Sequence, residues 1–143
     1  MGALGRAIPK LENSFPVVPA NLYECADGEI YIGVLLDKHW GILARLINQA
    51  DLANDSRFAT AKSRLENRAE VDKIVGQWCK VNARSVLLAM LNEAGIPASG
   101  VASYQEAAKN PQVISRNMLQ EIEIEPGIFG EVVGPPSKFS KTP

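Results

Sequence analysis

The order of apolar and polar residues predicts a hairpin, then a set of helices, then a second hairpin. Residues 21–34 alternate aromatic and β-branched side chains around Asp27 and Gly28, and an Asp-Gly pair supplies the positive φ angles of a tight turn. A helix is expected at about 38–49, with Asp37 as its cap. Its buried face has the spacing i, i+3, i+4, i+7 and consists of Trp40, Leu43, Ala44 and Ile47.

Two longer helices are predicted in the middle of the chain. After a short irregular or helical stretch at 51–64, Asn67 and Glu70 have the spacing of a capping box, so a helix should begin there. A helix at about 84–94 should end at Gly95, in the left-handed conformation common after helices. The apolar face of the first of these helices ends on a tryptophan that we expect to be largely buried: Val71, Ile74, Val75 and Trp78.

Shorter elements are predicted toward the C-terminus. Residues 99–102 read as a short strand, residues 103–106 as a second capping box, and residues 110–111 as a helix start with proline at its first position. Residues 119–125 alternate isoleucine with glutamate, which predicts a half-buried strand with an acidic outer face, paired with residues 131–133.

Strands near both ends with helices between them indicate an α+β fold, in which a small antiparallel sheet from the terminal hairpins packs with the helices. Residues 1–19 contain three prolines and no clean period, so we expect an extended leading segment. Residues 20–143 are then expected to form one domain. The length of 143 residues, with 46% hydrophobic and 22% charged residues, is ordinary for a globular protein.

Charge and cysteine content exclude several classes of function. Fifteen basic and sixteen acidic residues give a net charge of −1, so neither nucleic acid nor a membrane surface is an expected partner. The chain has no apolar run of the roughly 20 residues that span a bilayer, and no signal-peptide layout. Cys25 and Cys79 show no CxxC spacing, which fits a reducing compartment, so we expect a cytoplasmic protein.

Catalytic motifs are absent from the sequence: it has no GxGxxG, GxxxxGK[ST], HExxH or GxSxG, and one histidine is too little for the usual metal sites. That residue, His39, could act as a general base, but a histidine at a helix terminus is the simpler interpretation. Cys25 and Cys79 read as small hydrophobic residues. Four glutamates could be paired catalytic carboxylates, but they more simply keep a sheet edge soluble: Glu121, Glu123, Glu125 and Glu131.

Read from end to end, the chain resembles the small domain of family III CoA-transferases, which include formyl-CoA transferase, carnitine CoA-transferase and α-methylacyl-CoA racemase. The resemblance rests on the order of short motifs rather than on any one of them. In chain order they are Gly5 to Pro9, Asp27 to Ile32 with Trp40, Asp55 to Thr60 with Arg64, Asn67 and Arg68, Ala94 to Pro97 with Val101, Glu106 with Asn110 to Val113, and Gly130 with Pro135 to Pro143.

The resemblance implies a division of labour within a larger enzyme. Family members have a large Rossmann-like domain that holds most of the CoA site and the catalytic aspartate, and two chains interlock as rings. The aspartate attacks an acyl-CoA and then carries CoA as a thioester to another carboxylate. The stretch with that aspartate would precede this chain, so we assign no catalytic residue; the aspartates considered and rejected are Asp27, Asp37, Asp51, Asp55 and Asp72.

The resemblance also implies candidates for contact with the substrate cleft or a domain interface. In formyl-CoA transferase a glycine-rich loop covers the active site, and the corresponding stretch here, about Lys10 to Phe15, has no glycine. The apolar run Phe15–Val18 would lie at the domain boundary, so we expect residues 1–16 to pack on a second copy of the chain or to be mobile. The candidate residues are Arg6, Lys10, Asn13 and Phe15.

The expectation from sequence is therefore a domain that is inactive by itself. Its implied partners are acyl-CoA, the missing large domain and a second copy of the chain in a homo-oligomer, with coenzyme A as a substrate and no resident cofactor. The alternative is a free-standing module that binds a small molecule or a protein and keeps the fold without catalysis. A third interpretation, a small enzyme that uses His39, requires that histidine to lie in a cleft.

Overall fold

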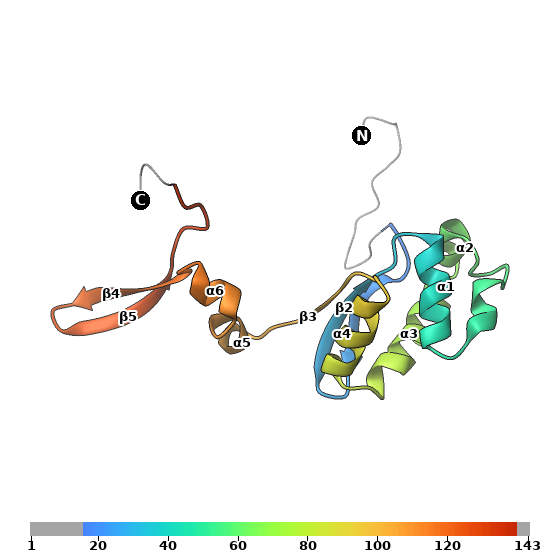
Figure 1. The fold of residues 1–143 in the computed structure, drawn as a ribbon, viewed down its shortest axis with the longest axis horizontal. Helices are drawn as coiled ribbons and strands as arrows, with labels where there is room; N and C mark the ends of the chain where they lie inside the picture. The colour runs from blue at the N-terminus through green and yellow to red at the C-terminus, as the bar shows by residue number, and fades with distance from the viewer. Residues whose placement is uncertain (1–15, 140–143) are drawn as a thin grey trace. The chain divides into compact units, whose positions relative to one another are not determined.

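The computed structural model describes residues 16–139 and confirms the α+β class. The chain forms two compact units that divide between Val101 and Ala102, a division that the sequence did not indicate within the expected domain at 20–143. The first unit contains, in order, β1 (Ala20–Cys25), β2 (Gly28–Gly33), α1 (Asp37–Leu46), a 3-10 helix (Ala50–Ala53), α2 (Ala61–Glu66), α3 (Arg68–Lys80), α4 (Arg84–Glu93) and β3 (Ala98–Gly100) (Figure 1). The second contains α5 (Tyr104–Ala108), α6 (Pro111–Ser115), β4 (Leu119–Glu125) and β5 (Ile128–Val133).

The first unit is built on a three-stranded antiparallel sheet with the order β1-β2-β3. The predicted hairpin is confirmed, with Tyr23 opposite Ile30, and β3 adds to its second strand with Gly100 opposite Ile30. Of the turn residues only Gly28 has a positive φ, +147°. Because inward side chains such as Tyr23 and Ile30 are buried while Leu22 is 52% exposed, the helices cover one face of this sheet (Figure 1).

One apolar core lies between the sheet and the helices of the first unit. The predicted face of α1 is confirmed, since all four of its apolar residues are buried. α1 begins at Asp37 and ends at Leu46, three residues before the expected end, because Asn48 turns into the left-handed region with φ +62°. The buried side chains of the core include Val18, Ile30, Ile32, Trp40, Leu43, Phe58, Val71, Val75, Cys79, Leu87, Leu91 and Ile96.

Trp78 packs against the core as predicted, but it is less completely buried than the residues around it. The buried line on α3 runs through Val71, Val75 and Cys79 at a spacing of four residues, and this places Trp78 at its margin, where the ring is half-buried. Cys79 therefore fills the position expected for the tryptophan. Trp40 is the tryptophan that anchors the core.

The end of α4 follows the sequence signal. Gly95 has φ +70°, the Ile96 amide donates to the Leu91 carbonyl at 2.9 Å, and the Gly95 amide donates to the Asn92 carbonyl at 3.1 Å. These two bonds form a Schellman motif, which pairs carbonyls that the helix leaves free. Ile96 enters the core directly after the turn.

In the second unit the predicted elements form, but the predicted burial is wrong. The capping box of Ser103 and Glu106 is present, and Asn110 caps α6 ahead of Pro111. β4 and β5 pair as an antiparallel ribbon, with Ile122 opposite Gly130 and a bulge between Glu123 and Glu125. The strand expected to be half-buried is not covered: among residues 102–139 no apolar side chain is buried.

Candidate functional site

The four residues predicted to contact a substrate cleft or interface, Arg6, Lys10, Asn13 and Phe15, lie outside the described residues. The described chain starts just after them. Of the apolar run at its start, Pro16 is exposed as the sequence suggested, Val17 is half-buried, and Val18 is 1% exposed and belongs to the core.

Arg64 connects the start of the described chain to the core. It is 1% exposed, and its Nε donates to the Val18 carbonyl at 2.9 Å while its Nη1 donates to the Phe58 carbonyl at 2.9 Å. Its Nη2 donates to Asp37 Oδ1 at 2.8 Å, and its guanidinium carbon lies 5.5 Å from the ring centroid of Trp40. Because these contacts occupy the guanidinium, Arg64 holds the fold together and is not available to a substrate.

The bond from Arg64 also explains why the prediction for Asp37 is wrong. Asp37 lies in the first turn of α1, the N-cap position is Leu36, and no side chain caps the helix there. The carboxylate of Asp37 accepts from the buried guanidinium instead of from the helix amides. Burying an arginine requires a partner for its charge, and this requirement outweighs one capping bond.

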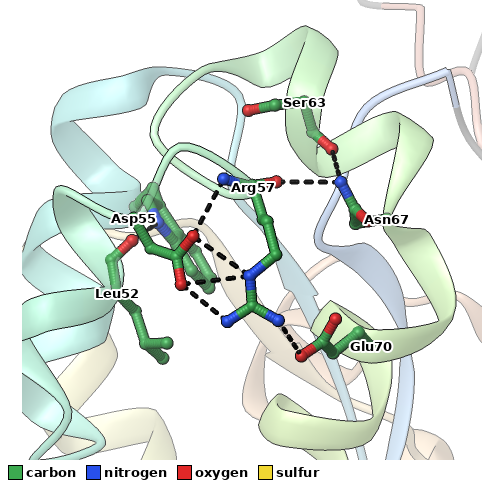
Figure 2. Close-up of polar contacts among 7 residues, drawn as sticks. Leu52, Asp55, Arg57, Ser63, Asn67 and Glu70 are labelled. Carbon is green, nitrogen blue, oxygen red and sulfur yellow. Dashed lines mark hydrogen bonds and ion pairs between the residues drawn. The ribbon is translucent and has the colours of Figure 1, made fainter.

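An ion-pair cluster around Arg57 lies on the surface next to α3 (Figure 2). Arg57 donates to Asp55 through Nη2 at 2.7 Å and through Nε at 3.1 and 3.2 Å, while Nη1 donates to Glu70 Oε1 at 2.7 Å. The hydrogen bonds from Arg57 hold the pKa of Asp55 below its usual value, and the same bonds raise the pKa of Arg57. Two carboxylates already neutralise this guanidinium, so it does not suit the carboxylate or phosphate of a substrate.

The same cluster replaces the capping box predicted for α3. The helix does begin at Arg68, but its N-cap residue, Asn67, makes no side-chain capping bond. Asn67 Nδ2 instead donates to the carbonyls of Ser63 at 2.9 Å and Arg57 at 3.1 Å, as Figure 2 shows, and Glu70 pairs with Arg57. The side-chain amide of Asn67 thus connects the start of α3 to α2 and to the segment that contains Arg57.

His39 has no catalytic neighbour among the described residues. Its side chain is half-buried, and Nδ1 is buried without a hydrogen-bond partner in that part of the chain. A histidine that acts as a general base needs a group that orients the ring and a nucleophile within about 3 Å. Among residues 16–139 no hydrogen bond orients the ring through Nδ1.

The two cysteines are free, buried and unreactive in the native state. Burial is the main cause that raises the pKa of Cys25, and it raises the pKa of Cys79 to about 12. Burial and the hydrogen bond to Asp72, 2.6 Å from the hydroxyl, also raise the pKa of Tyr23. All three groups are neutral at pH 7.

Alkaline solution should therefore destabilise the protein. The native state holds the Cys79 proton more tightly than the unfolded chain, in which the pKa is close to 9, so the stability present below pH 9 is lost as pH rises toward 12. For this thiol alone we expect a loss of about 1 kcal/mol between pH 9 and pH 10. Urea unfolding at a series of pH values measures this slope. Cys79→Ala should be less stable at neutral pH and should show a shallower slope, and an equal slope in both proteins would refute the assignment.

Asp27 has a role that the sequence did not reveal. Its Oδ1 accepts from the backbone amide of Arg84 at 2.6 Å, so the hairpin turn caps α4 from 57 positions away. The preceding residue, Ala83, has no side chain that could make this bond. Arg84 in turn donates from Nη1 to the Val101 carbonyl at 2.6 Å, which fixes the last residue of the first unit.

Asp27→Ala should lower the free energy of unfolding by about 1 kcal/mol, the usual cost of losing an N-terminal helix cap. Asp27→Asn should retain most of the stability, because an amide oxygen can accept the same bond. Chemical denaturation of the two variants would compare them directly. If both lost the same amount, the charge of Asp27 and not its capping bond would be the cause.

The second unit contains a surface hollow of about 340 Å³. It offers one carboxylate and one amide but no basic group, so it lacks the positive charge that would attract the phosphates of CoA. Its lining is Ala108, Val113, Ile114, Asn117, Leu119 and Glu131. No cluster of metal-binding side chains occurs among residues 16–139, and no helix there is both long and apolar enough to cross a bilayer.

Comparison with known families places this fold in a specific group. Residues 3–143 match the profile of CoA-transferase family III. The chain is 35% identical over 104 residues to succinyl-CoA–D-citramalate CoA-transferase of Chloroflexus aurantiacus, covering 72% of this chain and 26% of that enzyme. It is 31% identical over 141 residues to succinate–glutarate CoA-transferase of Agrobacterium fabrum, covering 97% of this chain and 35% of that enzyme.

A solved structure agrees with this grouping. The crystal structure of a CAIB/BAIF family protein from Brucella suis matches with a TM-score of 0.81 and 29% identity, over 96% of this chain and 35% of that chain. This chain therefore spans between about a quarter and about a third of the length of these relatives.

Proposed function

The chain belongs to CoA-transferase family III, and on that premise we propose that it is the small domain of such an enzyme and contributes one wall of the acyl-CoA cleft. The chemistry takes place on protein outside this chain. The observation that carries the proposal is the second unit, where residues 102–139 form regular elements without burying one apolar side chain. A unit without a core of its own needs another protein surface for stability.

The substrate class follows from the relatives. The Chloroflexus enzyme is named for succinyl-CoA and citramalate and the Agrobacterium enzyme for succinate and glutarate, so both act on pairs of short dicarboxylic acids. We propose the same class here: CoA passes from succinyl-CoA to a second short dicarboxylate. CoA is then a substrate and not a resident cofactor. The enzyme is cytoplasmic and dimeric in this proposal, and the two buried free thiols fit a reducing compartment.

The described residues support the assignment of catalysis to another part of the enzyme. An aspartyl nucleophile must reach the thioester carbonyl and be held in place there. Asp37 and Asp55 are bound by arginines, Asp72 accepts from Tyr23, and Asp27 caps a helix. Each of these carboxylates already has a structural partner.

A free-standing binding module remains the rival proposal, and the core of the first unit is the observation in its favour. That unit has a continuous buried core and could fold as a module by itself. The uncovered second unit favours the transferase instead, because a ribbon that buries no apolar side chain adds no stability to a free module.

A domain graft tests the proposal. The segment of the Agrobacterium enzyme that matches this chain is replaced by the chain itself, and CoA transfer from succinyl-CoA is measured with glutarate, citramalate and a monocarboxylate as acceptors. We expect transfer to the dicarboxylates above the level of the enzyme without the segment. The matched control is the Agrobacterium enzyme in which the same replacement is made with its own segment. A folded graft that transfers no CoA, beside an active control, would contradict the proposal.

A further inference from the structure

The two faces of the β4–β5 ribbon differ in chemistry. Residues opposite one another in an antiparallel pair share a face. Leu119 opposes Val133, Glu121 opposes Glu131 and Glu123 opposes Phe129, so these residues form one face, with three carboxylates beside three apolar side chains. The other face contains Ile122 opposite Gly130, Val132 opposite Gln120 and, beyond the bulge, Ile128 opposite Glu125, so it carries a single carboxylate.

Gly130 lets the Ile124 side chain lie across the second face, beside Ile122. Ile124 occupies the bulge, and a Cβ added to Gly130 would lie 2.7 Å from Ile124 Cδ1, so a side chain at position 130 would require the end of the isoleucine to move. The Ile124 side chain therefore lies flat over the glycine, on the side of Ile122. We define the apolar face as Ile122, Ile124 and Val132, which are 42%, 63% and 38% exposed.

An uncovered face of this kind is unusual for a two-stranded ribbon. A ribbon is marginally stable unless its apolar side packs on something, and within residues 102–139 no side chain buries this one. Three well-solvated carboxylates favour an exposed position for the acidic face, where Phe129 and Val133 are exposed as well. The apolar face has no such explanation.

The size of the apolar face decides between two possible occupants, a second copy of this chain and another part of the same polypeptide. A free dimer needs roughly 800 Å² of contact on each partner, and three partly exposed side chains are far below that. Ribbons that associated with each other would also bring together two groups of four glutamates, with no basic residue among residues 119–133 to offset them. A small contact is sufficient when both surfaces belong to one polypeptide, because the chain that links them holds each surface near the other at an effective concentration of about millimolar.

We propose that the apolar face docks on the part of the same transferase polypeptide that lies outside the third matched by this chain, while the acidic face stays in solvent. This inference rests on the proposed function and adds the surface through which the domain is held. The relatives supply the length for such a partner, since the match covers 35% of the Agrobacterium enzyme and of the Brucella structure. The occupant is a surface that is apolar where it meets Ile122 and Ile124.

Amide hydrogen exchange of residues 119–133 tests the docking, with the β1–β2 hairpin as an internal reference. In the isolated chain the ribbon should exchange fast at every protein concentration, while β1–β2 stays protected. In the Agrobacterium graft the ribbon should slow by about tenfold or more. The double variant Ile122→Ser/Ile124→Ser should abolish that slowing, and Phe129→Ser, a control of similar exposure on the acidic face, should retain it.

Several results would overturn the docking. A ribbon that is already protected in the dilute isolated chain needs no partner, and protection that grows with concentration means a second copy is the occupant. If amide exchange of the ribbon stays slow in the double variant, the apolar face is not the docking surface. The same conclusion follows if Phe129→Ser abolishes the slowing equally. The proposed function is tested separately in the same graft: transfer without ribbon protection refutes the docking alone, and protection without transfer refutes the function alone.

Discussion

Replacing Arg64 by alanine is expected to lower the free energy of unfolding by about 3–5 kcal/mol, one of the two largest effects of a single substitution in this chain. The side chain is 1% exposed, and its removal leaves the carbonyls of Val18 and Phe58 without partners inside the core. Unpaired buried carbonyls lose their hydration without compensation. Urea unfolding monitored by tryptophan fluorescence measures the loss.

Asp37→Asn is the matched control for Arg64. The Asp37 side chain is 54% exposed, so its pairing with Arg64 is weakened by solvent and should contribute about 1 kcal/mol or less. In this variant the two carbonyls keep their donor. If Asp37→Asn lowered the free energy of unfolding as much as Arg64→Ala, the stability that Arg64 contributes would come from its ion pair and not from its bonds to the two carbonyls.

Trp40→Ala should cost a similar amount, about 3–5 kcal/mol. The ring is fully buried, packs edge-on against Phe58 with centroids 6.2 Å apart, and donates from Nε1 to the Leu52 carbonyl at 3.1 Å. Alanine would leave a cavity and an unpaired carbonyl. Calorimetric or denaturant melts of the variant give the value.

Trp78→Ala provides the comparison for Trp40. Because Trp78 is half-buried at the edge of the core, its loss should cost about 1–2 kcal/mol, and the surface can relax around the gap. A larger cost for Trp78 than for Trp40 would mean that the buried face of α3 is rotated from the one described.

Signals confined to a few neighbouring residues predicted the local structure well. The capping box at Ser103, the Asn110 cap before Pro111 and the Schellman turn at Gly95 all form where the sequence placed them. Each depends on hydrogen bonds within one turn of chain, so no distant residue is needed to form it. The apolar face of α1 followed its period for the same reason.

Contacts between distant residues were the ones that sequence reasoning missed. Asp37 and Asn67 have the residue types of caps, yet Arg64 binds the first, and the second donates to the carbonyls of Ser63 and Arg57. Asp27 was assigned to its own turn, although it also caps α4. A side chain that can cap a helix has few other hydrogen-bond partners in an isolated segment but several in a folded protein. The sequence does not show which of these partners it binds.

Burial in the second unit could not be predicted from alternation alone. The pattern at 119–125 indicates which side chains share a face, and the strand confirms it as far as Glu123, after which the bulge interrupts the alternation. It does not indicate what covers that face. The candidate site was likewise beyond the sequence, because Arg6, Lys10, Asn13 and Phe15 rest on the family resemblance and lie outside residues 16–139.

The central claim, that this chain shapes the site but does not perform the transfer, is tested most directly by assaying the isolated chain. The purified chain is incubated with succinyl-CoA and glutarate, acyl-CoA exchange is followed by mass spectrometry, and hydroxylamine is added to trap any covalent thioester. We expect no exchange and no trapped adduct, because the proposed function assigns the nucleophilic carboxylate to protein outside this chain. Turnover that disappears when one aspartate of this chain is changed to asparagine would contradict it.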